Sequence, residues 1–268
     1  MVELGYETTQ PVTMDTMIHH CQAVTRGCRR PLLVGDMPFG SYEHCNVEAT
    51  RNAHRFIKEG NVDCVKLEGG VRRASVVRDI VDSGVAVMGH IGLTPQAFST
   101  LGGFRSQGRS ADAALRVIED ALAIQDAGAF ALVIECVPAT VAREVSGVLD
   151  IPTIGIGAGP HVSGQVLVYH DLLGMMQHHH HGKVTPKFCK QYATVGKHIQ
   201  EALEAYRDEV VAGEFPGAAF SPYEMAAGQE EGFTERVAET VRQYHARAGN
   251  AYAAPPTVDT SAPATKVY

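Results

Sequence analysis

Four apolar runs in the sequence each end in ionisable residues, and these residues are the strongest candidates for chemistry. They are Asp36 after LLVG, Lys66 and Glu68 after VDCV, His90 after VAVMG and Glu135 after FALVI. In parallel α/β folds the carboxyl ends of the strands form the active face, so such side chains converge there. One strand-end carboxylate is more often a cap for the next helix, but four successive strand ends of this kind favour a shared site.

The carboxylates of Asp36 and Glu68 suit a hard divalent cation such as Mg²⁺, which prefers oxygen ligands. The alternative is that they cap helices or pair with Lys66. Lys66 and Glu68 are two residues apart and therefore point to the same side of a strand. Lys66 then either places positive charge beside the metal for a substrate carboxylate or forms a plain salt bridge with Glu68.

Glu135 ends an apolar stretch two strands further on, an environment in which a carboxylate can act as a general base. The alternative is a structural glutamate with satisfied hydrogen bonds. His90, within GHIGLTPQ, either polarises a carbonyl group or hydrogen-bonds at a strand end, and the sequence favours neither interpretation.

The segments that must position these residues alternate between apolar runs and helical patterns. Strands are predicted at 31–39, 62–70, 85–92, 130–138, 151–159 and 165–174. Helices are predicted at 12–27, 45–60, 73–83, 112–127, 139–148 and 186–213. Continuous apolar strands alternating with helices indicate a parallel sheet covered on both faces, built from six strand–crossover steps.

Composition excludes several classes of protein. The 268 residues are 45% hydrophobic and 20% charged, as in soluble globular proteins. A net charge of −7 without a basic stripe argues against a nucleic-acid partner, and no apolar run is long enough to predict a membrane span. Six cysteines spread singly, without a C-x-x-C pair, indicate reduced thiols in a reducing compartment.

Three further segments are not expected to carry the main chemistry. GIGAG (155–159) does not complete G-x-G-x-x-G, because Pro160 follows it. The histidine run His178–His181 is interpreted as a solvated loop with weak adventitious metal binding. A surface helix is predicted at 230–248, followed by a disordered tail at 251–268 that is rich in Ala, Pro, Thr and Ser.

Seven motifs, in order and with matching spacing, resemble the ketopantoate hydroxymethyltransferase family. They are DMPFGSY (36–42), VKLEGG (65–70), MGHIGLTPQ (88–96), GGFRSQGR (102–109), VIECVP (133–138), PTIGIGAG (152–159) and GQVLVYHDLLG (164–174). The resemblance covers residues 4–224, and HHGKVTPKFCKQY (180–192) is most similar to plant and algal members.

The resemblance implies an α/β fold, the (β/α)₈ TIM barrel, with six of its eight β/α units in residues 1–227 and a C-terminal extension at 228–268. It implies hydroxymethyl transfer from 5,10-methylenetetrahydrofolate to 3-methyl-2-oxobutanoate, with Mg²⁺ as cofactor. Matched motif by motif, Asp36 becomes a metal ligand that also contacts the keto acid, and Glu68 becomes part of the metal site. Lys66 binds the substrate, Glu135 accepts the proton, and His90 lies near the substrate.

The sequence departs from the family at its start. Family members begin with two further strand–helix units that end in T-A-Y-D and V-G-D-S types of motif, and GYETTQPVTMD (5–15) resembles the segment just after them. We therefore expect the first two units to be missing. An inactive fragment or structural subunit is one alternative. Another Mg²⁺-dependent barrel enzyme acting on a 2-oxo-acid enolate is a second, although its K-K-C-G-H type of loop is absent.

The expected partner is the small-molecule substrate, with no nucleic acid and no membrane. The family also implies a homo-oligomer, a decamer. The first residues resemble neither a signal peptide nor a transit peptide. A mitochondrial matrix location is expected if the full-length protein carries a presequence, and a cytoplasmic location otherwise.

Overall fold

A computed structural model describes residues 3–176 and 186–247 of the chain. The chain divides into two compact units, Met1–Glu201 and Ala202–Tyr268. The histidine run and the tail at 251–268 lie outside the described residues. The domain boundary expected at residue 227 remains a prediction.

The first unit is built on six parallel strands that pair in sequence order from β1 to β6. They are β1 (Val34–Asp36), β2 (Cys64–Glu68), β3 (Val87–Gly92), β4 (Ala131–Glu135), β5 (Thr153–Ile156) and β6 (Gly164–Gln165). Parallel strands in unbroken sequence order have the winding of a (β/α) barrel, whereas the strand order of a doubly wound sheet reverses at a switch point. The predicted barrel-type α/β fold with six strand units is therefore confirmed.

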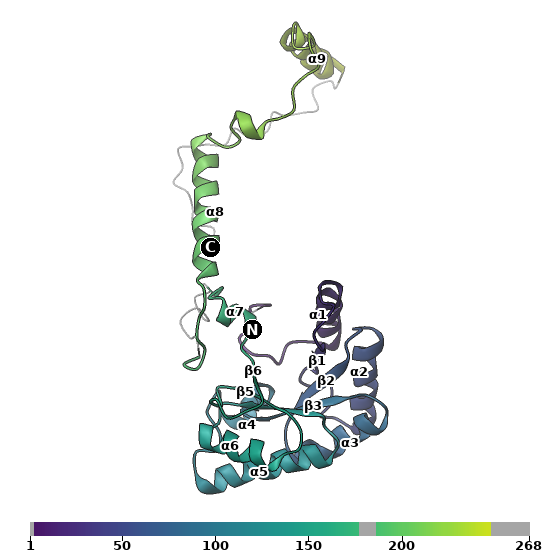
Figure 1. Ribbon diagram of the computed structural model, residues 1–268. Helices are drawn as coiled ribbons and strands as arrows, with labels where there is room; N and C mark the ends of the chain where they lie inside the picture. Colours follow the sequence, from purple (N-terminus) through teal and green to yellow (C-terminus); the bar gives the residue numbers. More distant parts are fainter. Residues whose placement is uncertain (1–2, 177–185, 248–268) are drawn as a thin grey trace. The chain divides into compact units, whose positions relative to one another are not determined.

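Helices join successive strands and lie along one side of the sheet (Figure 1). These crossover helices are α2 (Asn46–Lys58), α3 (Ala74–Asp82), α5 (Ala111–Asp126) and α6 (Ala139–Val148). Helix α1 (Met14–Gly27) precedes β1. Short elements complete the connections: η1 (Val71–Arg73), η2 (Pro95–Ala97), α4 (Phe98–Leu101) and α7 (Tyr169–Leu172).

The alternation of side chains along the strands decides which residues enter the core and which reach the other face. Leu67 and Leu132 are fully buried within the hydrophobic core. A Cβ added at Gly35 would overlap the ring of Phe56 in α2, so Gly35 faces the helices. Its neighbour Asp36 consequently faces the opposite side of the sheet.

Two predicted segments differ from the structure. Of the predicted strand at 165–174, only Gln165 lies in β6 and pairs with β5, and Tyr169–Leu172 form α7 instead. A short apolar run is compatible with either a strand or a helix, and periodicity alone does not distinguish them.

The long helix predicted from residue 186 begins only at Val195, as α8 (Val195–Ala212). The chain around this start pairs with α7, because the backbone N–H groups of Tyr192 and of Val195, the first residue of α8, donate to the carbonyl groups of Leu172 and Leu173. The start of α8 is therefore fixed by its pairing with the end of α7.

The second unit contains the end of α8, η3 (Ala218–Phe220) and α9 (Phe233–Arg247), which confirms the predicted surface helix at 230–248. Among the described residues, no helix has the length and hydropathy needed to cross a membrane.

We expect Gly35→Ala to destabilise the protein by about 1–3 kcal/mol, because the added methyl group overpacks the site occupied by Phe56. Gly147→Ala is the matched control: this helical glycine has open space around its Cα, so alanine should stabilise by about 0.5–1 kcal/mol. Urea unfolding followed by circular dichroism measures both changes. Wild-type stability in Gly35→Ala would show that Gly35 does not limit the approach of α2.

Candidate active site

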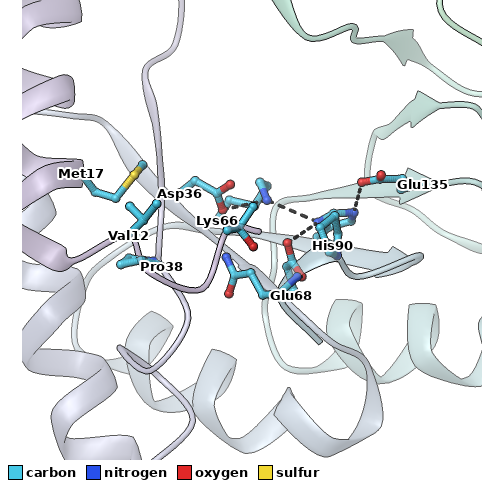
Figure 2. Close-up of a pocket in the computed structure, with 11 residues that line it drawn as sticks. Val12, Met17, Asp36, Pro38, Lys66, Glu68, His90 and Glu135 are labelled. Carbon is cyan, nitrogen blue, oxygen red and sulfur yellow. Dashed lines mark hydrogen bonds and ion pairs between the residues drawn. The ribbon is translucent and has the colours of Figure 1, made fainter. Parts of the chain in front are cut away.

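The structure brings all five predicted site residues into one pocket of about 210 Å³ (Figure 2). They reach it because neighbouring strands are in register. Asp36 of β1 pairs with Lys66 of β2, and Glu68 of β2 pairs with His90 of β3. Glu135 of β4 pairs with Gly92, which ends β3.

Gly92 permits the close approach of β3 and β4 beside Glu135. Its φ is +89°, a conformation that favours glycine, and an added Cβ would overlap the carbonyl oxygen of Glu135. The next residue, Leu93, donates its N–H to that carbonyl at 2.8 Å. The backbone of Glu135 is thus fixed directly beside β3.

The ionisable side chains form a connected series across the pocket, which Figure 2 shows as dashed lines. Lys66 Nζ lies 2.7 Å from Asp36 Oδ1 and 3.3 Å from His90 Nδ1. His90 Nε2 lies 3.0 Å from Glu135 Oε2, and its Nδ1 lies 3.6 Å from Glu68 Oε1. His90, which is 3% exposed, is therefore the group through which the series reaches Glu135.

Opposite charges keep Lys66 and Glu68 ionised despite their burial. Burial disfavours the charged form of Lys66, but the carboxylates of Asp36 and Glu68 outweigh it and raise the pKa of the ammonium group. Burial likewise disfavours ionised Glu68, but the adjacent imidazole and charge of His90 and the charge of Lys66 lower the pKa of that carboxyl.

His90 is flanked by two carboxylates and one ammonium group. Burial and the charge of Lys66 disfavour the imidazolium, but the adjacent carboxylates of Glu135 and Glu68 outweigh them and raise the pKa of His90. Protonated His90 donates from both ring nitrogens. Neutral His90 can accept at Nδ1 from Lys66, while its Nε2 lies close to Glu135 without a well-directed hydrogen bond.

Glu68 also has structural partners. The alternative that this carboxylate caps a helix, given above, therefore holds in part. Its Oε2 accepts the backbone N–H of Gln96 at 2.9 Å, at the start of η2. Its own N–H donates to the hydroxyl of Tyr42 at 3.3 Å. Burial raises the pKa of Tyr42, so the hydroxyl remains protonated and can donate in turn.

The sequence reasoning missed Gln96 and Tyr42, because it searched only for ionisable groups at strand ends. Both nevertheless lie in recognised motifs: Tyr42 ends DMPFGSY and Gln96 ends MGHIGLTPQ. It also missed an apolar side of the pocket, on which Val12, Met17 and Pro38 lie near Asp36 (Figure 2).

For a divalent cation, the pocket offers the two carboxylates of Asp36 and Glu68 rather than a complete set of protein ligands. Within residues 3–176 and 186–247, no three His, Cys, Asp or Glu side chains are arranged to hold a metal ion. Asp36 Oδ1 is buried without a well-directed hydrogen bond, although Lys66 Nζ lies nearby, and so retains capacity for another ligand. Mg²⁺ commonly uses one or two carboxylates, with water and substrate oxygens completing its shell. Asp36 and Glu68 fit a site of that kind.

Comparison with known proteins gives one consistent family. The sequence profile of ketopantoate hydroxymethyltransferases matches residues 1–218. The chain is 58% identical over 234 residues to 3-methyl-2-oxobutanoate hydroxymethyltransferase 1, mitochondrial, of Oryza sativa subsp. japonica, which covers 87% of this chain and 64% of the rice protein. The chain therefore spans slightly less than two thirds of that relative's length.

Two other relatives agree. The mitochondrial Arabidopsis thaliana protein of the same name is 57% identical over 234 residues, covering 87% of this chain and 67% of that protein. The Heliobacterium modesticaldum enzyme is 55% identical over 221 residues, covering 82% of this chain and 78% of that enzyme.

Among solved structures, a phosphonopyruvate hydrolase aligns with a TM-score of 0.46 and 11% identity. The alignment covers 89% of this chain and 80% of that chain.

We expect the imidazole of His90 in the metal-free protein to titrate above pH ~6.5, the ordinary pKa of histidine, because two carboxylates hold its proton. Because the folded-state pKa is raised, the stability from protonated His90 is fully present below pH ~6.5. That stability is lost as the pH rises through the folded-state pKa. NMR of the imidazole nitrogens measures the titration.

Glu135→Gln should lower the pKa of His90, because it removes one of the two carboxylates. The matched control is Glu144→Gln, which changes an exposed glutamate of α6 and should leave that pKa unchanged. A wild-type His90 that titrates at or below the ordinary value would contradict the assignment.

Proposed function

Because the chain belongs to the ketopantoate hydroxymethyltransferase family, we propose that the protein transfers a hydroxymethyl group from 5,10-methylenetetrahydrofolate to 3-methyl-2-oxobutanoate, giving 2-dehydropantoate. The observation that carries the proposal is the connected series from Asp36 through Lys66 and His90 to Glu135. Family membership argues against the alternative of another Mg²⁺-dependent barrel enzyme acting on a 2-oxo-acid enolate.

The charge of the pocket supports a divalent cation. Three carboxylates against one ammonium group leave the pocket negative when His90 is neutral, which disfavours an anionic 2-oxo acid. In the proposal, Asp36 and Glu68 hold Mg²⁺, which supplies Lewis-acid polarisation of the 2-oxo group when bound. Lys66 binds the carboxylate of the acid from the same side.

Glu135 acts as the general base in the proposed reaction. It takes the C3 proton of the 2-oxo acid, and the electron pair of the broken C–H bond becomes the enolate. His90 Nε2 lies 3.0 Å from Glu135 Oε2 and helps to position that carboxylate. The methylene carbon of the folate then exchanges both of its C–N bonds, one for a bond to the enolate carbon and one for a bond to the oxygen of a water molecule. The two folate nitrogens that are released take up the C3 proton held by Glu135 and one proton of that water.

The size and lining of the pocket suit this substrate. Its volume of about 210 Å³ lies below the ~300–1,000 Å³ typical of sites for drug-sized ligands. Val12, Met17 and Pro38 offer an apolar wall for the two methyl groups on C3. We extend the mitochondrial location of the plant relatives to this protein as part of the proposal. The homo-oligomeric state that the family resemblance implies is a second part of it.

We expect Glu135→Gln to slow exchange of the C3 proton of 3-methyl-2-oxobutanoate by about 10²–10⁴-fold, the usual contribution of a general base. NMR in deuterated water, with Mg²⁺ and without folate, measures the exchange in the full-length protein. Glu144→Gln is again the control and should exchange at the wild-type rate. Unchanged exchange in Glu135→Gln would remove Glu135 from this role, and absence of exchange in the wild type would contradict the proposed function.

We expect Asp36→Asn to weaken Mg²⁺ binding at least tenfold, because the ligand loses its negative charge while keeping its shape. Calorimetric titration of the full-length protein with MgCl₂ measures the affinity. Asp82→Asn, at the exposed end of α3, is the matched control and should bind as the wild type does. Equal affinity in Asp36→Asn and the wild type would exclude Asp36 as a ligand.

A further inference from the structure

Gln96 connects the ends of three strands that carry the candidate site. It follows β3 by four residues, lies in the pocket wall and is 6% exposed. Its Nε2 donates to the carbonyl oxygen of Met37, the residue after Asp36, at 2.8 Å. Its backbone N–H donates to Glu68 Oε2 at 2.9 Å. One buried residue therefore contacts both the end of β1 and the carboxylate at the end of β2.

Tyr42 completes this arrangement. Its hydroxyl donates to Gln96 Oε1 at 2.6 Å and accepts the backbone N–H of Glu68 at 3.3 Å. Tyr42 is itself 2% exposed, so these bonds form away from bulk water. Both polar atoms of the Gln96 amide are thus used, and Glu68 is held through its backbone as well as through its carboxylate.

The two side-chain bonds of Gln96 require an amide. The carbonyl oxygen of Met37 needs a donor, and the hydroxyl of Tyr42 needs an acceptor. The Gln96 amide supplies the donor at Nε2 and the acceptor at Oε1. A glutamate at this position would set an ionised oxygen against the Met37 carbonyl. An apolar side chain would leave that carbonyl and the Tyr42 hydroxyl without their buried partner, which is costly.

We propose that Gln96 is a positioning residue, which fixes the carboxylates of Asp36 and Glu68 relative to each other so that both bind one divalent cation. The inference rests on the proposed function, because it concerns the same cation site. Without the amide, the backbone after Asp36 and the segment around Glu68 lose their shared connection. Outer residues that orient metal ligands typically change metal affinity by about 10–100-fold.

The test is calorimetric titration of the full-length protein with MgCl₂ in the absence of substrate. Gln96→Met keeps the length of the side chain and removes the amide, and should weaken Mg²⁺ binding by about 10–100-fold. The Mg²⁺ concentration for half-maximal C3 exchange should rise by the same factor. Tyr42→Phe removes only the hydroxyl and should weaken binding in the same direction by a smaller factor, which provides a second variant if Gln96→Met does not fold.

Gln125→Met is the matched control. The Gln125 side chain also accepts a backbone N–H, from Asp150 at 2.7 Å, but Gln125 lies near the end of α5 and does not line the pocket. Loss of this hydrogen bond in Gln125→Met should lower the stability of the protein without changing its affinity for Mg²⁺.

Wild-type Mg²⁺ affinity in folded Gln96→Met, or equal losses of affinity in Gln96→Met and Gln125→Met, would overturn the positioning role alone. A wild-type protein that binds no Mg²⁺ would instead overturn the cation site and the inference that rests on it. The wild-type titration and the comparison of variants therefore distinguish the two failures.

Discussion

The ion pairs around His90 are the constraint on which the rest of the site depends. Several ionisable groups share a small pocket, and burying charge is costly unless each charge has a close partner of opposite sign. Lys66 balances Asp36, and His90 lies between Glu68 and Glu135. The position of each group is therefore set by its neighbour, and a change in one protonation state alters the others.

This constraint reaches into the backbone. The partners come from four strands, so the pairs form only if the strands are in the observed register. Glycines make that register possible at two close approaches: Gly35 admits the ring of Phe56, and Gly92 admits the carbonyl of Glu135. The same side-chain alternation that places Gly35 against α2 places Asp36 in the pocket.

Glu68 shows how structural and chemical roles coincide in one residue. Gln96 and Tyr42 hold its carboxylate and its backbone, which is a structural function, yet the held carboxylate faces His90 and the pocket. A carboxylate fixed on one side by a backbone N–H loses little further freedom when it binds a ligand on the other side. The alternatives of capping residue and site residue are therefore compatible for Glu68.

The sequence by itself determined the parallel barrel-type sheet, the positions of most helices and the strand ends that carry the ionisable residues. Those features follow from local periodicity and from motifs, which are properties of neighbouring residues. Tertiary structure decided the partners. It showed that Lys66 pairs with Asp36 across the strands, that His90 contacts Glu135, and that Gln96 and Tyr42 support Glu68.

Tertiary structure also decided the start of α8, because Tyr192 and Val195 donate their N–H groups to the end of α7. These contacts join residues far apart in the chain, and no local pattern specifies them. Local patterns therefore show which residues reach the carboxyl edge of the sheet, whereas the register between strands decides which of them meet.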